Sequence, residues 1–183
     1  MGNDNIAPKL GRIDLKTSSM LKLKNKRKHM IDEKIVHKFY RAFAEGDAEQ
    51  MVSFYHEKAH FEDPIFGKLN AQQVANMWRM LIARRDKNTQ ITHKITGVNG
   101  GIIKVNWIAQ YNYGPKKRKV VNHVSAQLKI VDGRIMEHTD HFDLWKWTQQ
   151  AFGLPGYLLG WSSFMKMKIK GKVSLALKEF IES

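Results

Sequence analysis

The spacing of hydrophobic residues changes near the middle of the chain. Before Lys87, apolar residues recur every three or four positions, which is the period of an amphipathic helix. After Lys87 they alternate with polar residues, which is the period of a strand with one buried face. Helices followed by hairpin-linked strands predict an α+β fold, in which the helices cover one face of a curved antiparallel sheet.

The first half of the chain is predicted to hold three helices. The first begins near Asp32 and ends at Gly46, the second is capped by Asp47, and the third begins at Asn70. A short extended piece precedes the third helix, because Pro64 cannot continue the second one.

Four long strands are predicted after the helices. They cover residues 90–98, 102–113, 120–130 and 134–143. A three-residue turn centred on Asp132 would pair Ala126 with His138 and Val124 with Asp140 in the last hairpin. His138 and Asp140 would then share an otherwise apolar face. Because an unpaired buried charge is costly, this face predicts either a ligand pocket or a satisfied internal ion pair.

The chain returns to a helical pattern after the strands and ends in a basic amphipathic helix. We divide it into a basic, loosely ordered arm (residues 1–30), an α+β domain (31–150), and a C-terminal loop and helix (151–183). We expect the last segment to close over the open end of the domain as a lid.

The net charge of +14 lies mainly at the two ends of the chain. Residues 1–38 contain ten Lys or Arg against four Asp or Glu, and residues 144–183 contain six Lys against two Glu. The apolar residues within 154–183 make binding to a membrane surface an alternative to the lid. No nucleic-acid partner is predicted, because the basic clusters lack interleaved aromatic residues.

The absence of Cys excludes disulfides, thiolate zinc sites and cysteine catalysis. The absence of Cys fits the cytoplasmic location that we expect, and no signal peptide is recognised. Residues 56–60 match the zinc-protease pattern His-Glu-x-x-His, but that chemistry needs both histidines on one continuing helix. Pro64 ends any such helix, so neither a metal nor another cofactor is predicted.

Two segments resemble a known superfamily. Residues 39–67 contain Gly46-Asp47 between two helices and Glu62-Asp63-Pro64 after them, and residues 131–145 read VDGRIMEHTDHFDLW. Both are similar to the SnoaL-like and ketosteroid-isomerase-like branch of the nuclear transport factor 2-like superfamily. The resemblance implies a cone-shaped barrel with a cavity at one end, a hydrophobic small molecule as partner, and a homodimer formed through the sheet.

The resemblance also implies catalytic roles. Asp63 matches the base of ketosteroid isomerases, and Asp140 with His138 is similar to the acid/base pair of SnoaL-type cyclases. We take Asp140 as the base, His138 as its donor or orienting partner, and Asp63 as the alternative base. The predicted pocket wall consists of Phe39, Trp78, Trp107, Tyr111, Asn122 and Phe142.

Two related activities are not expected. The oxyanion donors of the isomerases, a Tyr and a protonated Asp, align with Phe39 and Ala126. Tyr40 is one position away and is expected to point elsewhere. The epoxide-hydrolase branch needs an Arg between two Asp residues, and no Arg lies on the predicted pocket faces.

Three functions remain open from the sequence. The first is cofactor-independent acid/base chemistry on a hydrophobic carbonyl compound, namely isomerisation, aldol-type cyclisation or dehydration. The second is a non-catalytic ligand-binding or scaffold domain, because the same fold serves both purposes. The third is a peripheral membrane protein.

Overall fold

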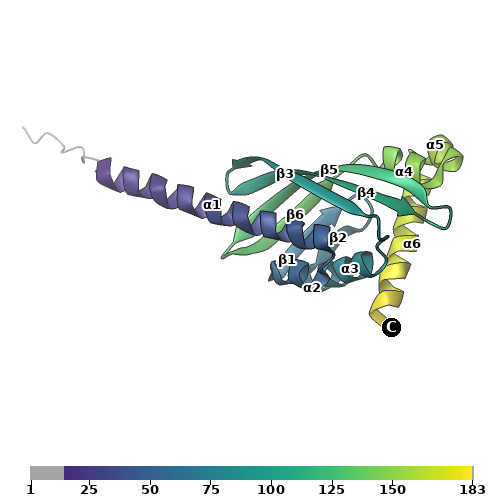
Figure 1. The fold of residues 1–183 in the computed structure, drawn as a ribbon, viewed down its shortest axis with the longest axis horizontal. Coiled ribbons are helices and arrows are strands. Elements are labelled where there is room, and N and C mark those ends of the chain that lie inside the picture. Colours follow the sequence, from purple (N-terminus) through teal and green to yellow (C-terminus); the bar gives the residue numbers. More distant parts are fainter. Residues whose placement is uncertain (1–14, 183) are drawn as a thin grey trace, which may run out of the picture.

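The first helix is much longer than the sequence predicted. In the computed structural model, which describes residues 15–182, α1 (Leu15–Glu45) is continuous (Figure 1). The predicted helix start at Asp32 is therefore wrong, and so is a loose arm through residues 15–30. Asp32 pairs with Lys28 of the preceding turn at 2.7 Å instead of capping a helix.

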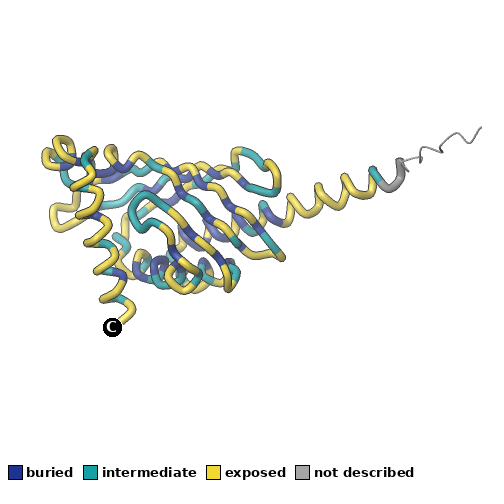
Figure 2. The backbone as a smooth tube through the Cα atoms, turned by 180° about the vertical axis from the view of Figure 1, so that it is seen from behind, coloured by how far each residue is buried: buried dark blue, intermediate teal, exposed yellow. Residues whose placement is uncertain are grey.

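The early part of α1 is helical although no other described part of the chain covers it. Residues 19–31 are exposed (Figure 2) and contain no Gly or Pro. They consist largely of Lys, Arg, Leu and Met, which are strong helix formers, so local propensity is enough to extend the helix. Residues 1–14 of the predicted arm lie outside the described residues.

The predicted caps after α1 are confirmed. The next elements are α2 (Ala48–Ser53), β1 (Tyr55–Asp63), β2 (Gly67–Asn70) and α3 (Ala71–Ala83). The Asp47 side chain accepts a hydrogen bond from the Gln50 backbone N–H at 2.9 Å at the start of α2. Asn70 and Gln73 form a reciprocal capping box on α3, with both hydrogen bonds at 3.0 Å.

The sheet is mixed and open, which corrects the predicted all-antiparallel sheet. The remaining strands are β3 (Gln90–Asn99), β4 (Ile102–Tyr113), β5 (Arg118–Val131) and β6 (Arg134–His141). The six strands follow the order β2-β1-β6-β5-β4-β3. Strand β1 lies parallel to β6, whereas the other neighbours are antiparallel. Parallel neighbours need a long crossover, so the local pattern that predicts hairpins gives no signal for this pairing.

The turn between β5 and β6 has two residues rather than three. Asp132 and Gly133 have φ values of 49° and 76°, as a type I′ turn requires, and Val131 pairs with Arg134. A bulge follows at Met136, which has no partner between the paired residues Ile135 and Glu137.

The turn and the bulge together move the register by two residues. His138 lies opposite Leu128 rather than Ala126, and Asp140 lies opposite Ala126 rather than Val124. Because side chains alternate with a period of two, this shift keeps both residues on the predicted inner face. Both are buried there.

Helices α1 and α3 cover one face of the curved sheet (Figure 1). The core beneath them is rich in aromatic residues, including Phe39, Tyr40, Phe43, Trp78 and Trp107. A second cluster lies around the helix that follows β6. Tyr111 and Phe142 pack against both clusters, so the α+β domain has one continuous core.

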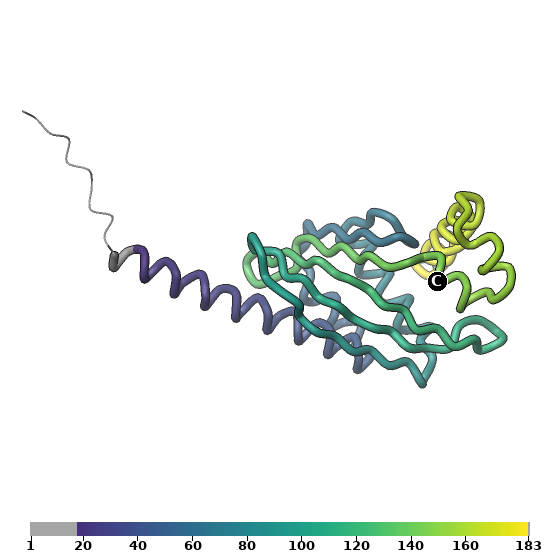
Figure 3. The backbone as a smooth tube through the Cα atoms, turned by 90° about the horizontal axis from the view of Figure 1, so that it is seen from above, coloured from purple at the N-terminus to yellow at the C-terminus, as the bar shows by residue number. Residues whose placement is uncertain are grey.

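Three helices complete the chain at the far end of the domain from the free part of α1 (Figures 1 and 3). They are α4 (Leu144–Phe152), α5 (Leu154–Leu159) and α6 (Ser163–Glu182). The predicted loop before α6 therefore contains a helix. Ile169 and Leu177 attach α6 to the two core clusters. Within residues 15–182 no helix combines the length and the hydropathy that crossing a bilayer would require.

Replacing Gly133 by Ala should lower the free energy of unfolding by about 1 kcal/mol, because an L-residue is strained at positive φ. Space is not the cause, since an added Cβ would lie 4.0 Å from Ile35 Cδ1. Urea denaturation measures the effect. Gly97→Ala is the control, because the φ of Gly97 is not positive and an added Cβ would meet nothing within 4 Å. An equal cost at both positions would contradict the role of the turn.

Candidate functional site

His138 and Asp140 form an ion-pair geometry in the middle of the core. Their relative exposures are 1% and 3%, and His138 Nε2 lies 3.1 Å from Asp140 Oδ1. The indole N–H of Trp107 donates to the same oxygen at 3.2 Å. The pair predicted from the last strand therefore exists, and β4 adds a second donor to it.

A tyrosine from β1 completes the hydrogen bonding of His138. Tyr55 Oη lies 2.6 Å from His138 Nδ1, and the Trp78 indole N–H donates to Tyr55 Oη at 3.1 Å. Burial raises the pKa of Tyr55, so its hydroxyl stays protonated. We therefore infer that Tyr55 donates to Nδ1 and that the proton on Nε2 points at Asp140. The hydrogen bonds therefore form a series, in which Trp78 donates to Tyr55, Tyr55 to His138 and His138 to Asp140.

Aromatic rings surround the imidazole of His138. Phe39 and Phe61 meet it edge-on, with ring centroids 5.7 and 5.1 Å away. The rings of Tyr55 and Trp78 lie nearly parallel to it, at interplanar angles of 15° and 27°, with centroids 6.1 and 6.4 Å away. Three predicted wall residues, Phe39, Trp78 and Trp107, thus contact the pair or its donors directly.

Asp63 lies beside Asp140 at the end of the adjacent strand. The register pairs Phe61 with His138 and Glu62 with Thr139, so Asp63 is next to Asp140 and on the same face. Asp63 Oδ1 accepts hydrogen bonds from the backbone N–H groups of Ile65 and Phe66. These hydrogen bonds lower the pKa of Asp63. Burial, assisted by the negative charge of Asp140, outweighs them and raises this pKa to about 6.

Tyr40 lies in the core and forms no hydrogen bond with His138 or Asp140. Its ring stacks on His93 with centroids 4.9 Å apart and lies 6.2 Å from Trp107. Among the residues whose side chains are described, Tyr40 Oη is the only buried polar side-chain atom without a hydrogen-bond partner. Burial first, and then the charge of Asp140, raise the pKa of Tyr40.

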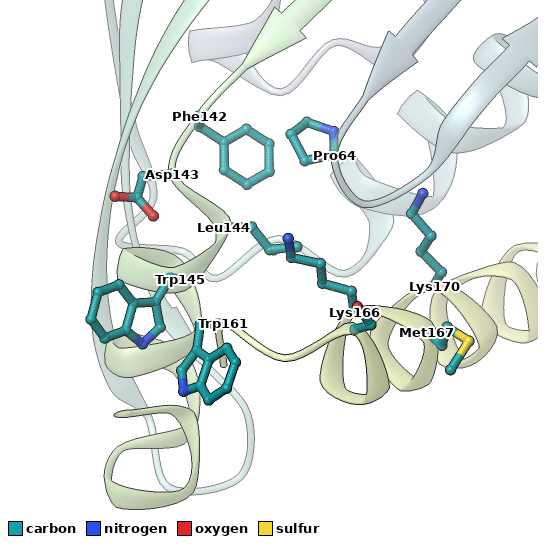
Figure 4. A pocket seen from close by; sticks show the side chains of 10 residues that line it. Pro64, Phe142, Asp143, Leu144, Trp145, Trp161, Lys166, Met167 and Lys170 are labelled. Carbon is teal, nitrogen blue, oxygen red and sulfur yellow. The ribbon is translucent and has the colours of Figure 1, made fainter. Parts of the chain in front are cut away.

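The other predicted wall residues lie toward the C-terminal helices. Tyr111 Oη accepts a hydrogen bond from the Trp147 indole at 2.8 Å, and Asn122 is half-buried opposite Ala109 on β4. Phe142 follows β6 and faces a surface groove (Figure 4). The predicted wall is therefore divided between the packed core and this end of the domain.

The groove lies between α4, α6 and the residues after β1, and we call it the α4–α6 groove. Its volume is about 540 Å³. Its lining includes Pro64, Phe142, Leu144, Trp145, Lys166 and Lys170 (Figure 4). Because Pro64 directly follows Asp63, the groove begins one residue from the candidate base.

The zinc-protease pattern has no metal geometry. His56 and His60 lie on β1 rather than on a helix, and both side chains are at the surface. In the described part of the chain, no three His, Asp or Glu side chains are grouped so that they could hold a metal ion.

Tyr55 is the site residue that the sequence did not indicate. Tyr55 is four residues from the buried Met51, a spacing typical of one helix face, but α2 ends at Ser53 and Tyr55 begins β1. Its partner His138 is 83 residues away in the chain. Only the parallel pairing of β1 with β6 brings the two together.

Residues 36–138 match the SnoaL-like domain family, and this match covers the end of α1, the helices α2 and α3, and most of the sheet. The chain belongs to this family. Helices α4, α5 and α6 lie beyond the residues that match the SnoaL-like domain. A comparison with curated proteins finds no significant match.

Solved structures share the fold at low sequence identity. A protein with a ketosteroid isomerase-like fold from Catenulispora acidiphila DSM 44928, crystallised with trimethylamine, gives a TM-score of 0.56 at 16% identity over 67% of this chain and 95% of its own. An LEH-like epoxide hydrolase of Mycobacterium tuberculosis gives 0.54 at 19% identity over 71% and 96%. A candidate polyketide cyclase of Xanthomonas campestris pv. campestris gives 0.54 at 16% identity over 67% and 97%. These similarities establish the fold alone.

Replacing Tyr55 by Phe should lower the free energy of unfolding by about 1–3 kcal/mol, because His138 Nδ1 and the Trp78 N–H both lose a buried partner. Urea denaturation measures this cost. Tyr113→Phe removes a hydroxyl from a half-buried ring outside the network and should change stability by less than about 0.5 kcal/mol. Similar costs for the two variants would contradict the network.

Proposed function

We propose that the protein transfers a proton at the carbon next to the carbonyl group of a hydrophobic compound, and that Asp63 is the base. The observation that carries the proposal is the position and pKa of Asp63. Asp63 is half-buried at the end of β1, directly before Pro64 of the α4–α6 groove, and the pKa of its carboxyl group is about 6. A base works best when its pKa lies near the working pH.

The sequence favoured Asp140 as the base, and its surroundings argue for a different role. Asp140 is 3% exposed and accepts hydrogen bonds from His138 and Trp107. A substrate would have to displace this packed shell to reach it. We assign Asp140 as a positioning residue, whose charge contributes to the raised pKa of Asp63, and His138 as the residue that orients Asp140.

The groove supports a substrate with a hydrophobic body. Phe142, Leu144 and Trp145 give it an apolar lining beside Pro64. We propose that the substrate lies in the groove with its carbonyl end at Asp63, and that Asn122 and Tyr111 remain candidate contacts deeper in the domain.

The proposed step balances without a cofactor. The Asp63 carboxylate removes a proton from the carbon next to the carbonyl, and the resulting enolate holds the electron pair. If a carbon–carbon double bond adjoins the deprotonated carbon, the enolate is conjugated with it, and returning the proton to the far carbon of that double bond moves the double bond and isomerises the substrate. If the enolate attacks a second carbonyl instead, a carbon–carbon bond forms and the proton ends on the new alkoxide. Two proteins of the same fold, described as an epoxide hydrolase and a candidate polyketide cyclase, support the proposal that this fold can carry acid/base chemistry.

A non-catalytic ligand-binding or scaffold domain is the second candidate. The observation in its favour is that the His138 and Asp140 network is satisfied internally, so it needs no ligand. A homodimer through the outer face of the sheet and a cytoplasmic location remain predictions.

The Asp63→Asn variant should lose at least about 10²-fold in the rate of proton exchange, because the amide cannot accept the proton. Deuterium incorporation from heavy water into a panel of hydrophobic ketones, followed by NMR, measures this without knowledge of the natural substrate. Glu62→Gln is the control, because Glu62 is exposed and precedes Asp63 on the same strand. If no ketone exchanges, or if Asp63→Asn exchanges as fast as the wild type, the scaffold function replaces the catalytic one.

Asp63→Asn should also make the protein more stable at pH 8, by about 1–2 kcal/mol after allowance for partial exposure. The pKa of Asp63 is raised from 3.8 to about 6, so the folded state binds the proton more tightly than the unfolded state. The contribution of Asp63 to the free energy of unfolding is therefore most favourable below pH 4 and is lost as the pH rises through 6. The amide of the variant keeps the oxygen that caps the turn but carries no charge.

Thermal unfolding between pH 4 and 8 checks this pH dependence. The wild type should lose stability relative to Asp63→Asn over this range. In Asp140→Asn, loss of the neighbouring charge should lower the pKa of Asp63, as measured by carboxyl NMR titration. A difference between wild type and Asp63→Asn that is independent of pH would contradict the raised pKa.

A further inference from the structure

The short helix α5 turns its small residues toward the protein and its large apolar residues toward solvent. Gly156 and Gly160, one turn apart, are buried against α4. A Cβ on either glycine would lie 1.9 Å from an oxygen of Thr148, so only glycine allows this contact. The opposite side of α5 carries Leu154 and Leu158, which are 71% and 58% exposed. A helix that serves only to pack would bury its leucines, and this one presents them to solvent.

Aromatic residues extend the exposed surface. Trp161 and Phe164, after α5, are 65% and 62% exposed. The indole N–H groups of Trp145 and Trp161 donate to the carbonyl oxygens of Tyr157 and Leu158. These bonds hold the indoles against the α5 backbone while their rings remain in contact with solvent. We call Leu154, Tyr157, Leu158, Trp161 and Phe164 the α5 apolar surface.

Positive charge accompanies this surface. Between Asp143 and Glu179 the chain has six Lys and no acidic residue. Lys166 and Lys168 are exposed in the first turn after Phe164, and the ammonium of Lys168 lies 5.8 Å from the Phe164 ring centroid. Neither lysine forms an ion pair among the described residues.

From this combination we propose that α5 and the start of α6 dock the protein on the surface of an anionic phospholipid bilayer. Leucines that enter the acyl boundary, aromatic rings at the headgroup level and lysines on the phosphates together match the chemistry of such a surface. The inference does not depend on the proposed catalysis.

A second copy of the chain is a poorer partner for the same surface. A symmetric contact through α5 would bring two sets of lysines together, with no acidic residue from α4 to the middle of α6 to pair with them. An anionic bilayer satisfies the apolar residues and the charges at once. The other exposed basic helix, the free part of α1, lies at the opposite end of the domain and serves as an internal comparison (Figures 1 and 3).

Co-sedimentation of the full chain with vesicles tests the proposal. Vesicles of equal parts phosphatidylcholine and phosphatidylglycerol should bind the protein, and pure phosphatidylcholine vesicles should bind it much more weakly. Raising the salt from about 0.1 M to about 1 M should weaken binding, because it screens exposed charges. The fluorescence of the exposed indoles should shift to the blue on binding.

Two variants locate the surface. Leu154→Ser with Leu158→Ser should lower binding at least about tenfold. Each lysine is expected to contribute about fivefold to vesicle binding. Lys166→Gln with Lys168→Gln should therefore lower vesicle binding about 25-fold. All four residues are exposed, so circular dichroism and the unfolding temperature should not change.

Matched controls separate α5 from the other candidates. Leu21→Ser with Leu23→Ser on α1, and Lys94→Gln with Lys104→Gln on the sheet, also replace exposed residues and should leave binding unchanged. Loss of binding in the α1 variant alone would overturn the proposal. So would an absence of vesicle binding, or a wild-type dimer that Leu154→Ser with Leu158→Ser converts to a monomer.

Discussion

A carboxyl group buried among aromatic rings needs hydrogen-bond donors from its surroundings, and this requirement organises the centre of the molecule. Asp140 obtains its donors from His138 and from Trp107 of β4. His138 in turn needs a donor at Nδ1, which only β1 supplies through Tyr55. The network therefore joins α3, β1, β4 and β6, and an error in any one register would leave a buried polar group without a partner.

The same requirement explains the chemical difference between the two carboxylates. Asp140 lies in the core among indole and imidazole donors. Asp63, its neighbour on the parallel strand, lies at the end of β1, where it is partly buried and close to the charge of Asp140. Two acidic groups on adjacent strands thus have unequal surroundings, and the pKa of the more accessible one, Asp63, is raised. That inequality is the usual basis for separating a positioning role from a proton-transfer role.

The C-terminal helices add a second layer of chemistry to the SnoaL-like domain. Glycines at the contact with α4 place α5 so close that its leucines can only face outward. The groove between α4 and α6 begins at the residue after Asp63 and shares Trp145 and Lys166 with the basic, apolar end of the molecule. The surface that we propose docks on a bilayer and the groove beside the proposed base are therefore neighbours.

Local patterns in the sequence determined the α+β class, the caps at Asp47 and Asn70, the four long strands and the inner face that carries His138 and Asp140. Each depends on contacts between residues close in the chain, or on a periodicity that a two-residue change of register preserves. Tertiary structure decided the features that depend on distant partners. The parallel pairing of β1 with β6 placed Tyr55 on His138 and Asp63 beside Asp140, and the packing of Trp78 and Trp107 filled the space that the sequence had assigned to a substrate. No local period encodes which strand becomes the neighbour of β1, because that choice depends on burying the whole face of the sheet at once.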